Sequence, residues 1–173
     1  MIETEYAFLV IRLVIGLLFV GHGAQKLFGW FGGGGIDGTT KFFEKLEIYP
    51  PSAWAVVTGL AETLGGLGLA LGLLTPIAAA VLIGTMLTAI IKVHGKNGLW
   101  NNNGGFEYNL VLLTVAAAIG LAGPGAYALD NSLAVDYPMP ITFIISLLVV
   151  LMGLIVSLIS SDIIDYIETE FQN

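Results

Sequence analysis

The sequence predicts an all-α protein with several membrane-spanning helices, on three observations. Of its 173 residues, 56% are hydrophobic and only 11% are charged, whereas a soluble domain carries roughly 25% charged residues because its surface faces water. The apolar residues also form long blocks rather than the spacing of an amphipathic helix. A net charge of −7 leaves no basic patch for a nucleic acid. The lipid bilayer is therefore the expected surrounding, with no nucleic-acid partner.

Five apolar blocks are candidate membrane spans. A spanning helix needs about 20 predominantly apolar residues to cross roughly 30 Å of hydrocarbon. The blocks cover approximately residues 6–28, 52–74, 76–93, 107–122 and 140–160. Phe42, Phe43 and Leu46, in the polar segment after the first block, predict an interfacial helix. Thr75 and Pro76 make a tight turn after the second block, with the proline at the start of the third, so these two helices are expected to form an antiparallel hairpin.

Several kinds of chemistry are excluded or disfavoured within this chain. It contains no cysteine, which excludes thiol nucleophiles, disulfides and Cys-ligated iron–sulfur clusters. The glycine run at residues 32–35 lacks the Gly-Lys-Ser/Thr ending of a phosphate-binding loop, so it is interpreted as a flexible linker. There are two histidines but no Glu-x-x-His pair. No metal site is predicted.

The lysines indicate how the chain lies in the membrane. With five spans, one side of the membrane receives all five lysines, and we call it the lysine-rich side; they are Lys26, Lys41, Lys45, Lys92 and Lys96. Cytoplasmic loops carry an excess of lysine and arginine. The sequence therefore predicts a multi-pass protein of the cell membrane, with the N-terminus outside and the C-terminus in the cytoplasm.

Two ionisable residues lie inside predicted spans. An isolated charge at the bilayer centre costs about 2.5–3.5 kcal/mol on insertion scales, so such groups usually face a partner or a cavity. Arg12 in the first helix and Glu62 in the second are placed at similar depths by counting residues from the lysine-rich side. Either they form a structural ion pair, or Glu62 handles protons or binds a ligand while Arg12 tunes it.

Small and polar residues form one stripe on each of the first three predicted helices. On the first helix the stripe runs through Arg12, Gly16, Phe19, Gly23 and Lys26. Small residues allow membrane helices to approach closely. The three helices are therefore expected to pack against one another through these stripes.

Further polar groups gather near the lysine-rich side, close to Trp30, Trp100, Phe106 and Tyr108. Two interpretations are open: an interfacial belt of anchoring aromatics and snorkelling lysines, or a pocket in which aromatic side chains stack on a ligand ring and polar groups contact its oxygens. Together with Glu62, the candidate ligand-binding residues are His22, Lys26, Glu62, Lys92, His94, Glu107 and Asn109.

Three stretches resemble the DoxX family of membrane proteins. They are GHGAQKLFGWFGG at residues 21–33, ETLGG at 62–66 with LGLLTP at 71–76, and GGFEYNL at 104–110 with GPG at 123–125 and LD at 129–130. The resemblance covers approximately residues 5–131, in the family's order and spacing. It implies a polytopic transmembrane four-helix bundle over residues 1–131. This chain departs from that pattern by an additional C-terminal transmembrane helix, at 138–160, and an acidic tail, at 161–173.

The resemblance also implies a function. Family members are associated with quinone-linked or thiol-related redox systems and with resistance to quinones and catechols, and a related group is a subunit of a thiosulfate:quinone oxidoreductase. By position, the family's polar residues here are Arg12, His22, Lys26, Glu62, Lys92, His94, Glu107 and Asn109. The expected ligand is a quinone or small phenol, and because no cofactor motif is present, redox partner subunits are expected. The alternative is a non-enzymatic membrane scaffold or small-molecule permease whose buried charges are structural.

Overall fold

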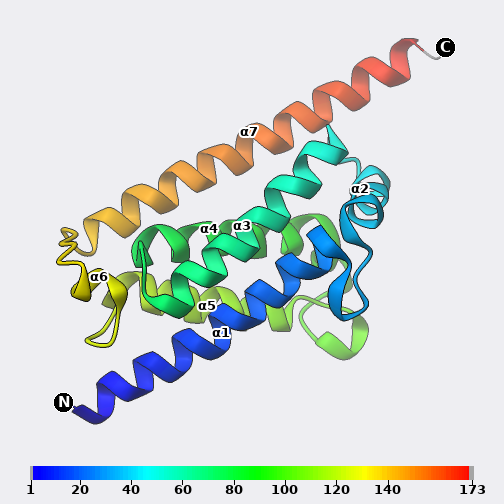
Figure 1. Ribbon diagram of the computed structural model, residues 1–173. Helices are drawn as coiled ribbons and strands as arrows, with labels where there is room; N and C mark the ends of the chain where they lie inside the picture. Colours follow the sequence, from blue (N-terminus) through cyan, green and yellow to red (C-terminus); the bar gives the residue numbers. More distant parts are fainter. Residues whose placement is uncertain (1, 172–173) are drawn as a thin grey trace.

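The computed structural model describes the backbone of residues 2–171 and the side chains of residues 4–159. All regular structure in this range is helical, as predicted (Figure 1). Five helices form the body of the protein, α1 (Ile2–Phe28), α3 (Pro51–Leu71), α4 (Thr75–Ala89), α5 (Glu107–Ala122) and α7 (Ile141–Phe171), and two short ones lie in connections, α2 (Gly35–Lys45) and α6 (Leu129–Ser132).

Four of the described helices are long and apolar enough to cross a membrane. They are α1, α3, α4 together with its extension to Asn97, and α7. The remaining predicted span, the fourth along the chain, is α5 with 16 residues, and at 1.5 Å per residue it covers roughly 24 Å, less than the usual hydrocarbon thickness. The turn between α3 and α4 occupies only residues 72–74, which confirms the predicted hairpin.

Helices α1 and α3 pack closely because glycines face each other across them. A Cβ atom on Gly66 would lie 2.6 Å from the carbonyl oxygen of Gly16, and one on Gly23 would lie 2.7 Å from that of Gly59. No side chain fits in such gaps, so the two backbones lie almost in contact. The predicted small-residue interface between the first two spans is confirmed.

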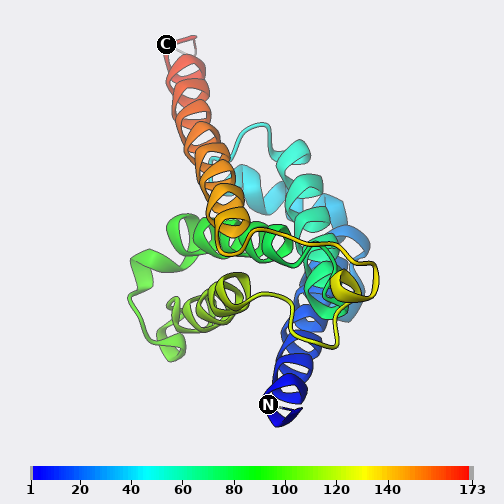
Figure 2. The same cartoon turned by 90° about the vertical axis from the view of Figure 1, so that its left-hand side faces the viewer.

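Helix α4 is the centre of the bundle. It packs against α3, α5 and α7, and in Figure 2 it lies between α7 above and α5 below. Its buried Leu82, Ile83 and Met86 form one hydrophobic core with Leu112 of α5 and Phe143 of α7. The core therefore reaches into the additional C-terminal helix as well as the four preceding ones.

Helix α7 lies at the periphery, as expected of a segment without charges between residues 140 and 160. Only 6% of its most apolar window is buried, so most of this helix is available to lipid. Its backbone continues as helix to Phe171. The segment predicted as an acidic tail is thus a continuation of the same helix, except for residues 172 and 173, which lie outside the described residues.

Candidate functional site

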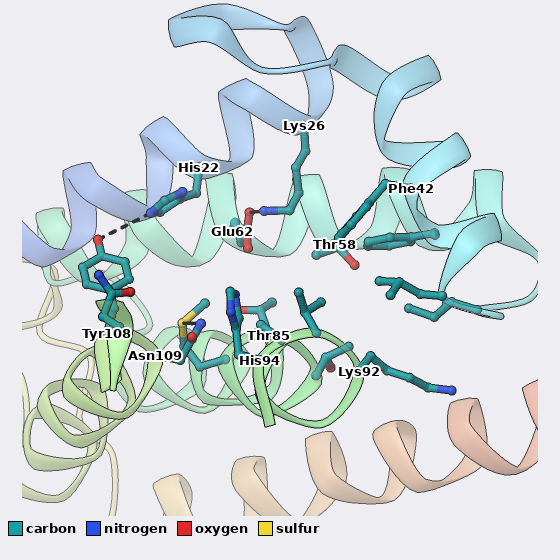
Figure 3. Close-up of a pocket in the computed structure, with 18 residues that line it drawn as sticks. His22, Lys26, Phe42, Thr58, Glu62, Thr85, Lys92, His94, Tyr108 and Asn109 are labelled. Atoms are coloured by element: carbon teal, nitrogen blue, oxygen red, sulfur yellow. Dashed lines mark hydrogen bonds and ion pairs between the residues drawn. The ribbon is translucent and has the colours of Figure 1, made fainter. Parts of the chain in front are cut away.

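A cavity of about 350 Å³ opens between α1, α3 and α4 near the lysine-rich side, bordered by α2 and the start of α5. Figure 3 shows side chains from these elements directed into it. Apolar side chains such as Phe43 and Met86 form much of its wall. The polar residues that line it are His22, Lys26, Thr58, Glu62, Thr85, Thr88, Lys92, His94, Asn101, Tyr108 and Asn109.

An ion pair forms the wall of the cavity between α1 and α3. Lys26 lies in the last turn of α1, and its Nζ donates to Glu62 Oε2 at 2.6 Å (Figure 3). The Glu62 side chain is only 4% exposed, whereas that of Lys26 is 26% exposed. The lysine thus places a positive charge beside a carboxylate that is almost completely shielded from solvent. Part of the lysine side chain itself remains exposed in the cavity.

The predicted ion pair between Arg12 and Glu62 is wrong. The two helices run antiparallel, and the contacts between their glycines set a register in which Arg12 lies opposite Gly72. Glu62 precedes Gly72 by about ten residues, so at 1.5 Å per residue it lies roughly 15 Å from the level of Arg12 along the axis of α3. The predicted helix ends give the two residues equal depth, but they cannot fix this register.

Arg12 instead holds the loop that follows α5. Its guanidinium donates to the carbonyl oxygens of Pro124 and Tyr127, and the side chain is 1% exposed. Tyr127 also stacks on Tyr6, with ring centroids 5.0 Å apart. A hydrogen bond with Tyr6 raises the pKa of the Tyr127 phenol. Arg12 is therefore a structural residue at the end of the bundle opposite the cavity.

Asp130 joins the same loop to the α3–α4 turn. Its carboxylate is fully buried and accepts hydrogen bonds from Leu74 N–H at 2.8 Å, Thr75 N–H at 3.0 Å and Thr75 Oγ1 at 2.8 Å. It thereby caps the N-terminus of α4, where unpaired N–H groups favour an anion. Burial raises the pKa of the nearby Tyr137 phenol, and the negative charge of Asp130 adds to this.

His22 and Tyr108 lie at the mouth of the cavity. His22 Nδ1 is 3.2 Å from Gln25 Oε1, and Nε2 is 3.5 Å from the Tyr108 hydroxyl. With Nδ1 donating to the amide oxygen, Nε2 is the acceptor for the phenol. The two rings meet edge to face, with centroids 6.1 Å apart. The ring nitrogens of His22 thus each have a side-chain partner at the mouth of the cavity.

A π-helical turn, Ile90–His94, extends α4 and carries Lys92 and His94. Such turns occur frequently at functional sites. His94 Nδ1 is 2.8 Å from the carbonyl oxygen of Gly104, and as its donor it leaves Nε2 as an acceptor. Lys92 lines the cavity with its stem, but its ammonium group extends away from the Lys26–Glu62 pair in Figure 3.

The two candidate ligand-binding residues at the start of α5, Glu107 and Asn109, have different surroundings. Asn109 is buried in the cavity wall, and its Nδ2 donates to Met86 Sδ at 3.5 Å, a weak bond. Glu107 is not among the lining residues. Its Oε2 accepts the backbone N–H of Asn101 at 3.0 Å, so it holds the preceding loop. Of the seven predicted ligand-binding residues, the structure therefore brings six around one cavity, and Glu107 lies outside.

Four lining residues that matter for the site were not predicted as members. Thr58, Thr85 and Thr88 lie on the inner faces of α3 and α4, and the sequence pattern indicates Tyr108 only as an aromatic near this side of the membrane. The polar stripes of the second and third helices were the signal for the threonines. Among the residues that the structure describes, no cluster of three His, Cys, Asp or Glu side chains could hold a metal ion.

Comparison with known proteins relates this architecture to a family. The model of the DoxX family matches residues 7–95. A Bacillus subtilis protein named "Putative oxidoreductase CatD" is 31% identical over 126 residues, which is 73% of this chain and 86% of that protein. The chain belongs to the DoxX family.

Other relatives of this DoxX protein are named as membrane proteins. The "Inner membrane protein YqjF" of Escherichia coli is 30% identical over 72% of this chain and 90% of its own length. The "Uncharacterized membrane protein Rv3486" of Mycobacterium tuberculosis is 29% identical over 76% and 84%. No solved structure matches the chain. The DoxX match includes the ion pair and both histidines, while α7 lies beyond it.

Proposed function

We propose that this DoxX protein binds a quinone or a related small phenol in the cavity between α1, α3 and α4, as part of a quinone-linked or thiol-related redox process. The observation that carries the proposal is a small set of polar groups inside an otherwise apolar cavity of about 350 Å³. Ligand pockets of this kind have volumes of roughly 300–1,000 Å³ and use a few polar groups to orient an apolar ligand.

The groups around the cavity suit the oxygens of such a ligand. Tyr108 offers a hydroxyl, Asn109 an amide, and His94 Nε2 an acceptor for a phenolic proton. Reduction of a quinone to its hydroquinone takes two electrons and two protons. His22 and the Lys26–Glu62 pair are titratable groups that could relay those protons from water.

The electrons must come from another protein under this proposal. The chain has no cysteine and no motif for a flavin or haem, so it lacks a centre of its own that could deliver two electrons. We therefore propose a redox partner subunit that supplies them to the bound quinone. Affinity purification from native membranes, followed by mass spectrometry, should recover a flavin-, haem- or thiol-bearing protein in stoichiometric amounts.

A membrane scaffold or small-molecule permease is the second candidate. The observation that favours it is the close Lys26–Glu62 pair, because a buried carboxylate neutralised at 2.6 Å also serves as a structural link between α1 and α3. The two candidates differ in what the purified protein contains. Quinone extracted together with the protein supports the first, and an empty protein that binds no added quinone supports the second.

Replacing His22 by alanine should weaken quinone binding. The change removes the imidazole that contacts Tyr108 at the mouth of the cavity, and loss of one such polar contact is expected to raise the Kd about tenfold, which is 1.4 kcal/mol. Calorimetric titration of the protein in nanodiscs with ubiquinone-1, a short-chain quinone, measures the effect. The same loss is expected for His94→Ala.

The control for both variants is Lys96→Ala, which changes an exposed side chain next to the π-helical turn but outside the cavity. All three proteins should be recovered from the membrane in equal amounts. Binding that is normal in both histidine variants would argue for the interfacial belt instead of a ligand pocket.

We also propose that the lysine-rich side of the protein is cytoplasmic, and single cysteines test this on a chain that has none. Asn102→Cys and Asp136→Cys introduce a thiol at exposed positions of the loops before α5 and before α7. On intact cells, a membrane-impermeant maleimide should label position 136 only, and position 102 should react after the membrane is opened. The reverse labelling pattern would invert the proposed orientation.

A further inference from the structure

A second cavity, of about 200 Å³, lies between α3, α4 and α7. Helices α3 and α7 both pack on α4, and the cavity occupies the groove between them. Its walls are almost wholly apolar, with Val57 and Trp54 on the α3 side and Val150 and Leu154 on the α7 side. The outer wall residues Val57 and Gly153 are exposed, so in a membrane the groove opens sideways to lipid.

The groove adjoins the polar cavity. The two share five lining residues, which are Phe43, Ile48, Thr58, Thr85 and Thr88. The hydroxyls of Thr85 and Thr88 donate to carbonyl oxygens of their own helix, those of Leu82 and Gly84, at 2.9 Å in both cases. These two hydroxyls are therefore satisfied within α4, and the boundary between the polar cavity and the groove suits an apolar chain.

Space remains in the groove at α7. A Cβ atom added to Gly153 would meet no heavy atom within 4 Å, although Gly153 lines the groove. One turn earlier, Val150 packs directly against Gly84 of α4 and holds the two helices together. Helix α7 thus closes one end of the groove and leaves the part beside the polar cavity open.

We propose that this groove holds the apolar chain of an amphiphilic quinone whose ring occupies the polar cavity, and that the ligand enters sideways from the bilayer between α3 and α7. The inference rests on the proposed quinone function and narrows it to membrane quinones with a long isoprenoid tail. A polar head in the first cavity and an apolar chain in the second match the chemistry of the two neighbouring spaces. A soluble phenol would use only the first.

Two variants that fill the groove from opposite walls test the proposal. Gly153→Leu extends a side chain from α7 into open space, and Val57→Trp does so from the exposed α3 face. Binding of ubiquinone-1 and ubiquinone-10, which share one head group, is compared in phosphatidylcholine nanodiscs. Each variant should bind ubiquinone-10 about tenfold more weakly, because the tail loses buried apolar area, while ubiquinone-1 should bind as it does to the unchanged protein. Met152→Leu, at an exposed α7 position outside the groove, is the matched control.

The possible outcomes separate the inference from the proposed function. If neither quinone binds the unchanged protein, the quinone function fails and the inference fails with it. If both quinones bind but neither groove variant discriminates between them, the function stands and the lateral groove is overturned. Squalene, an isoprenoid chain with no quinone ring, should compete with ubiquinone-10 but not with ubiquinone-1, because only the tail of ubiquinone-10 is proposed to occupy the groove. If dioleoylphosphatidylcholine added to the nanodiscs competes with ubiquinone-10 as strongly as squalene does, the groove is a site for bilayer lipid and the quinone tail is overturned.

Discussion

Replacing Lys26 by methionine is expected to destabilise the protein by about 3–5 kcal/mol, the typical cost of removing one partner from a buried ion pair. The Glu62 carboxylate would keep its position in α3, where it is 4% exposed, without the ammonium group 2.6 Å away. Methionine keeps an unbranched apolar stem of four atoms and lacks only the terminal ammonium, so the loss can be assigned to the charge. Thermal unfolding in detergent micelles measures it.

The double variant Lys26→Met/Glu62→Leu should recover most of the loss, because neither charge remains to be desolvated. Lys92→Met is the matched control. Lys92 is a half-buried residue that lines the same cavity, and its ammonium group extends away from the pair (Figure 3). Equal destabilisation in the single and the double variant would contradict this account, since it would assign the effect to packing and not to a stranded carboxylate.

Replacing Asp130 by alanine should cost at least as much. The change leaves Leu74 N–H and two donors of Thr75 without their acceptor, and each buried donor left unsatisfied costs about 1–3 kcal/mol. It also removes the negative charge that acts on the buried Arg12 guanidinium. The expected result is a loss of about 3 kcal/mol or more, measured by thermal unfolding and by the amount of protein recovered from the membrane.

Asp136→Ala provides the comparison, because it removes an exposed carboxylate from the same connection. Asp130→Asn should fall between the two, since an amide keeps an acceptor oxygen but places a donor group against the N–H groups of α4. If Asp130→Ala unfolds at the same temperature as Asp136→Ala, the capping interaction contributes nothing and α4 is held by its core alone.

Local patterns predicted most of the fold. Long apolar blocks identified the spanning helices, Thr75-Pro76 identified the hairpin, and the small residues of the first two helices identified their interface. These features depend on composition and periodicity along one segment. The Arg12–Glu62 pair failed because it needed the register between two segments, which the glycine contacts at Gly16 and Gly23 decide.

The candidate site was also predicted where it depends on position along one helix, and missed where it depends on how a loop folds. Residues such as His22 and His94 could be placed at one depth by counting along their helices, and they do line one cavity. Glu107 turned out differently because the loop before α5 folds back, with Phe106 N–H and Glu107 N–H bonded to the carbonyl oxygens of Gly98 and Leu99. Neither that loop nor the π-helical turn leaves a periodic signal in the sequence.

The distance along the chain between Arg12 and its partners has a consequence for biosynthesis. The carbonyl groups that receive its guanidinium are made 112 and 115 residues later, and the carboxylate that caps α4 is made 55 residues after Thr75. While α1 enters the membrane, its arginine therefore has none of its final acceptors. The first helix and the hairpin can complete their contacts only after the segment beyond α5 has left the ribosome. Chains that are paused or truncated before residue 130 should consequently remain bound to the insertion machinery and be degraded by quality-control proteases.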